Sequence, residues 1–226
     1  MISEGDRIAI GLSGGKDSLA LVYALAHFRR VAPVRFELCA ITVDAGWPDS
    51  DYGPLQRFLA QYDVPLTIEP TRIGEIVFKV RQESNPCSLC ANLRRGALNS
   101  RAAALGCNKV ALAHHLDDAI ETMLMSLLLE GRFHCFRPVT HLTRRDITVI
   151  RPLIYVWERD IAALAEELDL PVVDNPCPVN HRTQREEMKR LLAELEARFP
   201  GARRRLAAAL KSRAGTLPWG QYLVRD

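Results

Sequence analysis

The chain has 226 residues, of which 48% are hydrophobic, 25% charged and 7% aromatic, and its formal net charge is +3. This composition excludes a disordered, collagenous or coiled-coil chain, and the length suits one domain with or without a helical extension. No apolar run reaches the roughly 18 residues of a membrane span, and the first residues lack the features of a secretory signal. We therefore expect a cytoplasmic protein that makes no membrane contact.

Short apolar runs alternate with helical patterns along most of the chain. The predicted elements, in chain order, are a strand over 7–12, a helix over 18–28, a strand over 36–43, a helix over 54–62, a strand over 64–68, a helix over 93–105, a strand over 109–113, a helix over 116–130, a strand over 147–150, a helix over 158–168, an extended piece over 170–173, and helices over 183–198 and 202–213. Buried strands separated by helices indicate an α/β fold with a doubly wound parallel sheet. We expect one domain over residues 1–180 and a basic helical C-terminal extension over 181–226.

Positive charge is concentrated in that C-terminal extension. Residues 181–226 carry 11 Lys and Arg against 5 Asp and Glu, whereas residues 1–180 carry 19 against 22. A basic segment of this kind can follow the phosphate backbone of a nucleic acid, and it can equally be a solvated helix surface.

A glycine-containing segment, Ser13-Gly14-Gly15-Lys16-Asp17-Ser18, follows the first predicted strand and opens the first helix. Glycine allows a sharp turn and a close approach to a ligand, and the free N–H groups of a helix start favour an anion. The carboxyl end of a strand is also where open α/β sheets bind ligands. The segment matches neither the Walker A pattern nor the GxGxxG fingerprint, so it indicates another kind of phosphate loop.

Two histidines and two acids, in Ala113-His114-His115-Leu116-Asp117-Asp118, end the fourth predicted strand at the same sheet edge. Such groups could hold Mg²⁺ or orient reacting groups, although carboxylates at a helix start are also ordinary caps. On a helix Asp117 and Glu121 are four residues apart and share a face, and we expect Asp118 to face elsewhere.

The six cysteines fall into two groups. Cys39, Cys107 and Cys135 lie in or beside apolar runs and are expected in the core, and in a reducing compartment we expect no disulfides. The other group is a CxxC pair, Cys87 and Cys90, together with the distant Cys177. These three could hold a [4Fe–4S] cluster with one open iron, or they could form a structural zinc site with His181. The spacing does not decide between the two metals.

The segment SGGKDS is the signature of the PP-loop ATP pyrophosphatases, and CSLCANLRRGAL, HHLDD and RPLIYVWERDI resemble the tRNA 2-thiocytidine synthetase (TtcA) family within them. The resemblance runs from about residue 7 to residue 200. It implies an adenine nucleotide α-hydrolase-like fold whose loop holds the β- and γ-phosphates of ATP, with Mg²⁺ bridging Asp17 to them. It also implies that Cys87, Cys90 and Cys177 hold an oxygen-sensitive [4Fe–4S] cluster whose open iron carries sulfur.

The resemblance thus predicts an ATP-dependent tRNA sulfurtransferase that adenylates a pyrimidine carbonyl, cytidine C2 by analogy, and replaces its oxygen with sulfur, releasing AMP and pyrophosphate. The candidate catalytic residues are Asp17, Arg94 and Asp118. The candidate nucleotide-binding residues are Gly11, Leu12, Ser13, Gly14, Gly15, Lys16, Asp17, Ser18, Val43, Asp44 and His114. The expected partners are tRNA, bound by Arg203, Arg204, Arg205, Lys211 and Arg213, and a sulfur donor (a cysteine desulfurase or sulfide). The aromatic tail could pack on a second copy in a homodimer or on the chain itself.

One departure from the TtcA pattern is Cys177-Pro178-Val179-Asn180 in place of a second CxxC. It leaves the target base undetermined.

Three other functions stay open. A PP-loop sulfurtransferase for a small molecule fits the same motifs, as does an ATP-binding regulatory or scaffold protein with a zinc site. A PP-loop ligase that adds an amine, as in lysidine synthesis, would have no use for three clustered cysteines.

Overall fold

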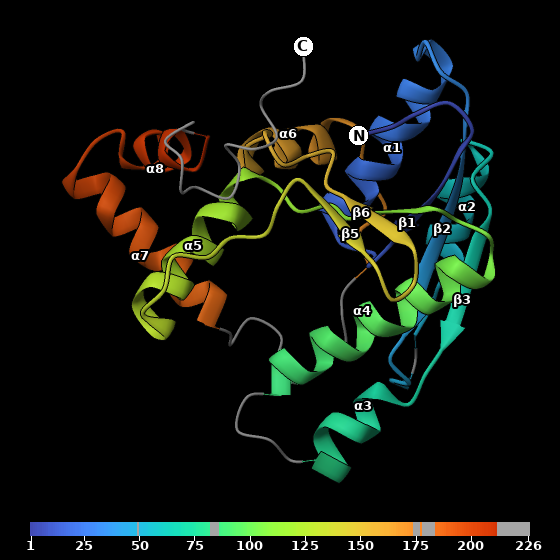
Figure 1. The fold of residues 1–226 in the computed structure, drawn as a ribbon, viewed down its shortest axis with the longest axis horizontal. Coiled ribbons are helices and arrows are strands. Elements are labelled where there is room, and N and C mark those ends of the chain that lie inside the picture. Colours follow the sequence, from blue (N-terminus) through green and yellow to red (C-terminus); the bar gives the residue numbers. More distant parts are fainter. Residues whose placement is uncertain (49, 82–85, 174–176, 178–183, 212–226) are drawn as a thin grey trace.

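The computed structural model describes residues 1–48, 50–81, 86–173, 177 and 184–211, and its ribbon is drawn in Figure 1. The strands are β1 (Asp6–Gly11), β2 (Phe36–Asp44), β3 (Leu66–Pro70), β4 (Lys109–Ala111), β5 (Val139–Leu142) and β6 (Ile147–Ile150). The helices are α1 (Lys16–Val31), α2 (Gly53–Ala60), α3 (Ile73–Glu75), the π-helix η1 (Ile76–Arg81), α4 (Pro86–Ala104), α5 (Leu116–Glu130), α6 (Glu158–Glu167), α7 (Gln184–Arg198) and α8 (Ala202–Lys211).

The strands form one sheet in the order β3-β2-β1-β4-β6-β5, with helices on both faces, which confirms the predicted α/β class. Side chains of β1 alternate between the faces because the period of a strand is two residues. Ile8 and Ile10 pack with α1, α2 and α6, whereas Ala9 packs with α4. The carboxyl ends of the parallel strands therefore meet between two helical layers.

Within the described residues the sheet is mostly parallel, with one antiparallel strand that was not predicted. β5 is an antiparallel edge strand that pairs with β6, with Val139 opposite Ile150. It has four residues, half of them polar (Thr140 and His141), so it shows no apolar run in the sequence. Two helical elements, α3 and η1, were also not predicted, and α4 begins at Pro86, about two turns before the predicted helix.

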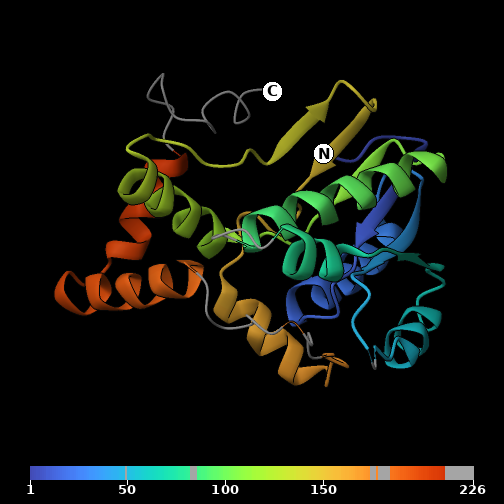
Figure 2. The same cartoon turned by 90° about the horizontal axis from the view of Figure 1, so that it is seen from below.

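The C-terminal helices pack on α5, away from the sheet (Figure 2). Ile120 and Met123 of α5 form a second core with Leu192 of α7 and Leu210 of α8. The predicted boundary between residues 180 and 181, and the predicted helix ends at residues 183 and 213, lie outside the described residues. Within the described ranges, no helix is both long and apolar enough to span a bilayer.

The three cysteines expected in the core are buried, as predicted. Cys39 and Cys107 lie with their sulfur atoms 3.5 Å apart between β2 and the start of β4. Cys135 donates from its thiol to the carbonyl oxygen of Ala119. All three are free thiols and pack as small apolar side chains.

A buried polar cluster fixes the N-terminal ends of β1 and β4. The carboxylate of Asp6 accepts hydrogen bonds from the backbone N–H of Ser3, the side-chain amide of Asn108 and the ammonium of Lys109. Burial alone would raise the pKa of Asp6, but these donors outweigh it and hold the pKa below its usual value.

We expect Asp6→Asn to lower the free energy of unfolding at pH 7 by about 1–3 kcal/mol, because the partly buried Lys109 then has no carboxylate to accept its charge-assisted hydrogen bond. Since the lowered pKa makes the Asp6 contribution disappear as the pH falls through that value, the two proteins should become similarly stable in strong acid. Urea denaturation followed by circular dichroism at several pH values measures the difference. Glu37→Gln is the control, because its pair with Arg7 is exposed; an equal loss of stability in both variants would contradict the prediction.

Candidate active site

The segment between β1 and α1 is held in shape by its own hydroxyl groups. The backbone N–H of Ser13 donates to Oγ of Ser18 at 3.2 Å, and that hydroxyl donates to the carbonyl oxygen of Gly15 at 2.9 Å. Gly14 has φ +86°, and its carbonyl oxygen accepts from the backbone N–H of Val173. Gly15, the N-cap of α1, makes no side-chain cap hydrogen bond, and a helix start of this kind favours an anion.

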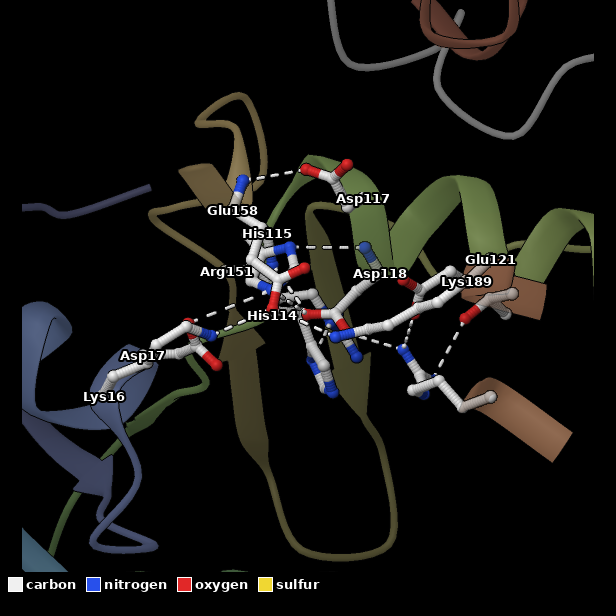
Figure 3. A network of polar contacts seen from close by, with 12 residues as sticks. Lys16, Asp17, His114, His115, Asp117, Asp118, Glu121, Arg151, Glu158 and Lys189 are labelled. Carbon is white, nitrogen blue, oxygen red and sulfur yellow. Dashed lines mark hydrogen bonds and ion pairs between the residues drawn. The ribbon is translucent and has the colours of Figure 1, made fainter. Parts of the chain in front are cut away.

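Lys16 does not project freely from this loop. Its ammonium lies 2.9 Å from Oδ1 of Asp17 and 2.9 Å from Oε1 of Glu158, the first residue of α6. Lys189 of α7 lies 3.0 Å from the same oxygen of Glu158. Burial would raise the pKa of Glu158, but hydrogen bonds from the two lysines lower it to about 2. Figure 3 shows Lys16 and Lys189 on either side of Glu158.

The two-histidine segment lies beside the loop, as the sequence led us to expect. His115 is the N-cap of α5. Its ring Nδ1 accepts a hydrogen bond from the backbone N–H of Asp118, and its backbone N–H donates to Oδ2 of Asp118. The Nε2 atom of His115 lies 3.9 Å from Oδ1 of Asp17. The loop and the start of α5 are thereby brought together at one edge of the sheet.

The acids at the start of α5 are divided differently from our expectation. Arg185 of α7 binds both Asp118 and Glu121, which are three residues apart and share a helix face. Asp117 instead accepts from the backbone N–H of Glu158 and from Arg203 of α8. The expectation that Asp118 faces away from Glu121 is therefore wrong, because both bind Arg185, whereas Asp117 is bound by residues of α6 and α8.

The buried carboxyl of Glu121 is the most perturbed acid of this group. Its side chain is 1% exposed, and burial raises its pKa to about 8 despite the opposing charge of Arg185. Its carboxyl is thus mostly protonated at neutral pH, in contrast to Glu158. The sequence analysis did not identify Arg185, Lys189 and Glu158. Their partners are more than 25 positions away in the sequence, so no local pattern marks these contacts.

A cavity of ≈ 460 Å³ opens at the carboxyl ends of β1, β2 and β4. Four guanidinium groups line it together with several apolar and a few polar side chains, so the cavity suits a ligand that is both anionic and aromatic. The predicted residues on its walls are Gly11, Leu12, Ser13, Val43, Arg94 and His114, and the arginines are Arg94, Arg95, Arg151 and Arg185. Asp44 instead turns its carboxylate to the N–H of Gly46 at 2.8 Å and shapes the turn after β2.

The CxxC pair lies in the first turn of α4, one turn before Arg94. Burial raises the pKa of the Cys87 and Cys90 thiols, and the nearby thiol of Cys177 raises both further. Arg94 opposes this shift at Cys90 by favouring the thiolate. The structure therefore places Cys177 within electrostatic reach of both members of the pair.

These thiols do not enclose a metal as they stand. Within the described part of the chain, no three Cys, His, Asp or Glu side chains are close enough together to hold a metal ion. The donor set nevertheless fits an iron–sulfur cluster, since all three cysteines are thiols outside disulfides and thiolates are the ligands of such clusters. The alternative zinc ligand, His181, lies outside the described residues.

The chain matches the family model of the PP-loop domain over residues 2–195. It is 43% identical to the tRNA-cytidine(32) 2-sulfurtransferase of Geobacter sulfurreducens over 213 residues, which cover 93% of this chain and 83% of the relative. The enzyme of the same name from Syntrophotalea carbinolica is also 43% identical, with 93% and 82% covered.

One solved structure is similar along most of the chain. It is the U34-tRNA thiolase NcsA of Methanococcus maripaludis with its [4Fe-4S] cluster, at a TM-score of 0.72 and 26% sequence identity. The match covers 92% of this chain and 71% of that protein.

We expect Gly14→Ala to destabilise the protein by about 1–2 kcal/mol and to weaken nucleotide binding. The positive φ strains any residue with a Cβ atom, and this atom would lie 3.3 Å from Cβ of Val173. Gly15→Ala is the matched control, because its φ is −76° and a Cβ there meets only Oγ of Ser13 at 3.6 Å. Thermal unfolding measures the stability of both variants and ATP titration the binding by Gly14→Ala, and equal stability of the two variants would disprove this role of Gly14.

We expect Glu158→Gln to make the free energy of unfolding less dependent on pH in the acid range. Because the pKa of Glu158 is lowered to about 2, its ion pairs stabilise the folded state above the usual carboxyl range and are lost as the pH falls toward 2. The variant should be less stable than the wild type at pH 7 and should lose less stability between pH 5 and pH 2.5. Urea denaturation across this range tests this, with Glu167→Gln, exposed at the end of the same helix, as the control.

Proposed function

Because this chain belongs to the PP-loop domain family and, within it, to the family of the tRNA-cytidine(32) 2-sulfurtransferases, we propose that it replaces the C2 oxygen of a tRNA cytidine with sulfur in an ATP-dependent reaction. One observation carries the proposal: the phosphate loop, the two-histidine segment and the cysteine-bearing helix α4 contribute Ser13, His114 and Arg94 to one cavity. A nucleotide, a base and a sulfur carrier can therefore meet in the same space.

ATP would bind across the carboxyl ends of β1 and β2. Val43 would contact the adenosine from the cavity wall, and the amides at the start of α1 would hold the phosphates. Asp17 is the proposed Mg²⁺ ligand, since its carboxylate lies at the phosphate loop and a divalent ion would reconcile it with an anion. Lys16 donates hydrogen bonds to both Asp17 and Glu158 and so links the loop to the start of α6.

The proposed reaction has two steps. The carbonyl oxygen of the base attacks the α-phosphorus of ATP, the bond to the β-phosphate oxygen breaks, and pyrophosphate leaves with its electron pair. A sulfur nucleophile then attacks the activated carbon, and AMP departs with the former carbonyl oxygen. Arg94 lines the cavity and would stabilise the negative charge that develops in both steps, because fixed donors are most effective in a site that excludes water.

Asp118 contributes to orientation in this proposal. Its carboxylate accepts hydrogen bonds from the backbone N–H of His115 and from the guanidinium of Arg185. Asp118 therefore links the start of α5 to an arginine on the cavity wall. Its carboxylate is well placed to hold Arg185 toward the bound substrate.

Cys87, Cys90 and Cys177 are the residues that would hold a [4Fe–4S] cluster. When bound through three thiolates, such a cluster offers one iron without a protein ligand, which can carry the transferred sulfur atom. Burial raises the pKa of Cys90, and Arg94 opposes this shift and so favours the thiolate that ligation requires. The sulfur donor in the proposal is a cysteine desulfurase or free sulfide.

Metal analysis of anaerobically prepared protein tests the proposal. We expect about four irons per chain, lost in Cys87→Ser, Cys90→Ser and Cys177→Ser. Cys107→Ala is the control, because this buried thiol packs against Cys39 and should leave the iron content unchanged. About one zinc per chain in place of iron would support the structural zinc alternative. Unchanged 2-thiocytidine in tRNA from a deletion strain would exclude tRNA as the substrate.

The basic surface of α8 is the proposed binding surface for tRNA phosphates. Arg204 and Arg205 are exposed, whereas Arg203 is already bound to Asp117. We expect Arg204→Gln and Arg205→Gln each to weaken tRNA binding and to reduce the slope of log K against log salt by about 0.9 or less for each phosphate that is no longer neutralised. Arg7→Gln is the control, since Arg7 lies at the opposite end of β1 from the phosphate loop. An unchanged slope in both α8 variants would rule out this binding surface.

A further inference from the structure

We infer that Arg151 fixes the imidazole of His114 in its Nε2–H tautomer, so that His114 is a neutral hydrogen-bond donor to a ligand oxygen in the cavity and not a base. The identity of that oxygen rests on the proposed function. The tautomer is a property of the protein alone and can be measured without any substrate.

The hydrogen bond between the two side chains determines where the proton is. Nε of Arg151 lies 3.1 Å from Nδ1 of His114. A guanidinium can only donate, so Nδ1 must present its lone pair. A neutral imidazole whose Nδ1 accepts carries its proton on Nε2.

Arg151 is itself held in one orientation. Its Nη1 atom donates to the backbone carbonyl of Arg137, and its own backbone N–H donates to the carbonyl of Pro138. The guanidinium lies 4.8 Å from the ring centre of Phe136, and the imidazole of His114 lies 4.7 Å from the same centre, tilted by 31°. Both planar groups therefore pack on one aromatic ring, which restricts rotation of either.

The surroundings of His114 keep its ring neutral. The charged or titratable groups around it are Asp118, Arg151, Arg185 and His115. Burial lowers the pKa of His114 to about 4; Asp118 opposes this shift, and the cationic groups reinforce it. Burial also lowers the pKa of Arg151, to about 10, so the donor keeps its charge at neutral pH.

The neighbouring histidine provides an internal comparison. Nδ1 of His115 also accepts a hydrogen bond, from the backbone N–H of Asp118, so His115 has the same tautomer. Its Nε2 lies 3.4 Å from Asp118 and 3.9 Å from Asp17, and its side chain is almost fully buried. Only His114 of the two lines the cavity, so only His114 can donate to a ligand there.

This arrangement separates two tasks within the cavity. The other arginines of the cavity supply positive charge to an anionic ligand. The Nε2–H group of His114 orients the ligand through a hydrogen bond and keeps its proton. Since the lone pair of Nδ1 is taken and Nε2 is protonated, His114 has no free basic nitrogen with which to remove a proton from a substrate. Arg151 is therefore a positioning residue that acts through His114.

Nuclear magnetic resonance of the full-length protein with ¹⁵N-labelled histidine tests the inference. We expect the His114 ring, identified by the loss of its signals in His114→Gln, to be a single Nε2–H tautomer between pH 6 and pH 8. Arg151→Met should yield a mixture that includes the Nδ1–H tautomer and should lower kcat by about ten- to hundredfold, as loss of an outer-sphere partner commonly does. Arg151→Lys, which keeps a donor, should restore the Nε2–H tautomer in part.

Arg145→Met is the matched control, because Arg145 also donates to a backbone carbonyl, that of Gly96, but lies away from the cavity. It should leave the His114 signals unchanged. An Nδ1–H tautomer or a protonated ring in the wild type overturns the inference. So does an unchanged tautomer in Arg151→Met, even if that variant is less stable.

Two additions identify the oxygen. A shift of the Nε2–H proton on adding a non-hydrolysable ATP analogue assigns it to the nucleotide, and a shift that appears only with tRNA assigns it to the base. No shift with either ligand would overturn the donor role, although the tautomer would stand. Failure of the proposed function would appear separately, as the absence of iron or of 2-thiocytidine.

Discussion

Charge compensation at the start of α5 is the constraint on which the site depends. Three carboxyl groups there, Asp117, Asp118 and Glu121, are buried or nearly so, next to the phosphate loop. An unpaired buried carboxylate is strongly destabilising, so each needs a cation or a proton. Arg185 and Arg203 provide the cations, and both come from the helices that follow the described part of the sheet domain. The C-terminal helices are therefore part of the site and not an appendage to it.

The same network shifts two carboxyl groups in opposite directions. Glu158 is about one-quarter exposed and binds two lysines, so hydrogen bonding dominates and its pKa falls to about 2. Glu121 is fully buried and shares one arginine with Asp118, so burial dominates and its pKa rises to about 8. The depth of burial, together with the hydrogen bonds from neighbouring cations, thus sets the opposite directions of the two pKa shifts. At neutral pH the network holds Glu158 charged beside Lys16 and Glu121 mostly neutral behind Asp118.

The parts of the molecule that the sequence predicts are those that depend on local pattern or on topology. Apolar strands separated by helices predict the sheet, and the carboxyl ends of parallel strands share an edge, which brings the loop of Gly14 near His115. The partners Arg185, Lys189 and Glu158 could not be predicted in this way, since exposed-looking charged residues on a helix have no periodicity that marks a distant contact. The start of α4 could have been found, because Pro86 favours the first turn of a helix.

The antiparallel strand β5 shows why an element without a sequence signal can still determine chemistry. Arg151 directly follows β6, and its position is fixed by hydrogen bonds to the carbonyls of Pro138 and Arg137, which directly precede β5. The antiparallel pairing of β5 with β6, with Val139 opposite Ile150, places these two carbonyls next to Arg151. The hairpin thus aims a guanidinium at Nδ1 of His114 on the neighbouring strand end. A short polar edge strand therefore controls which ring nitrogen His114 presents to the cavity.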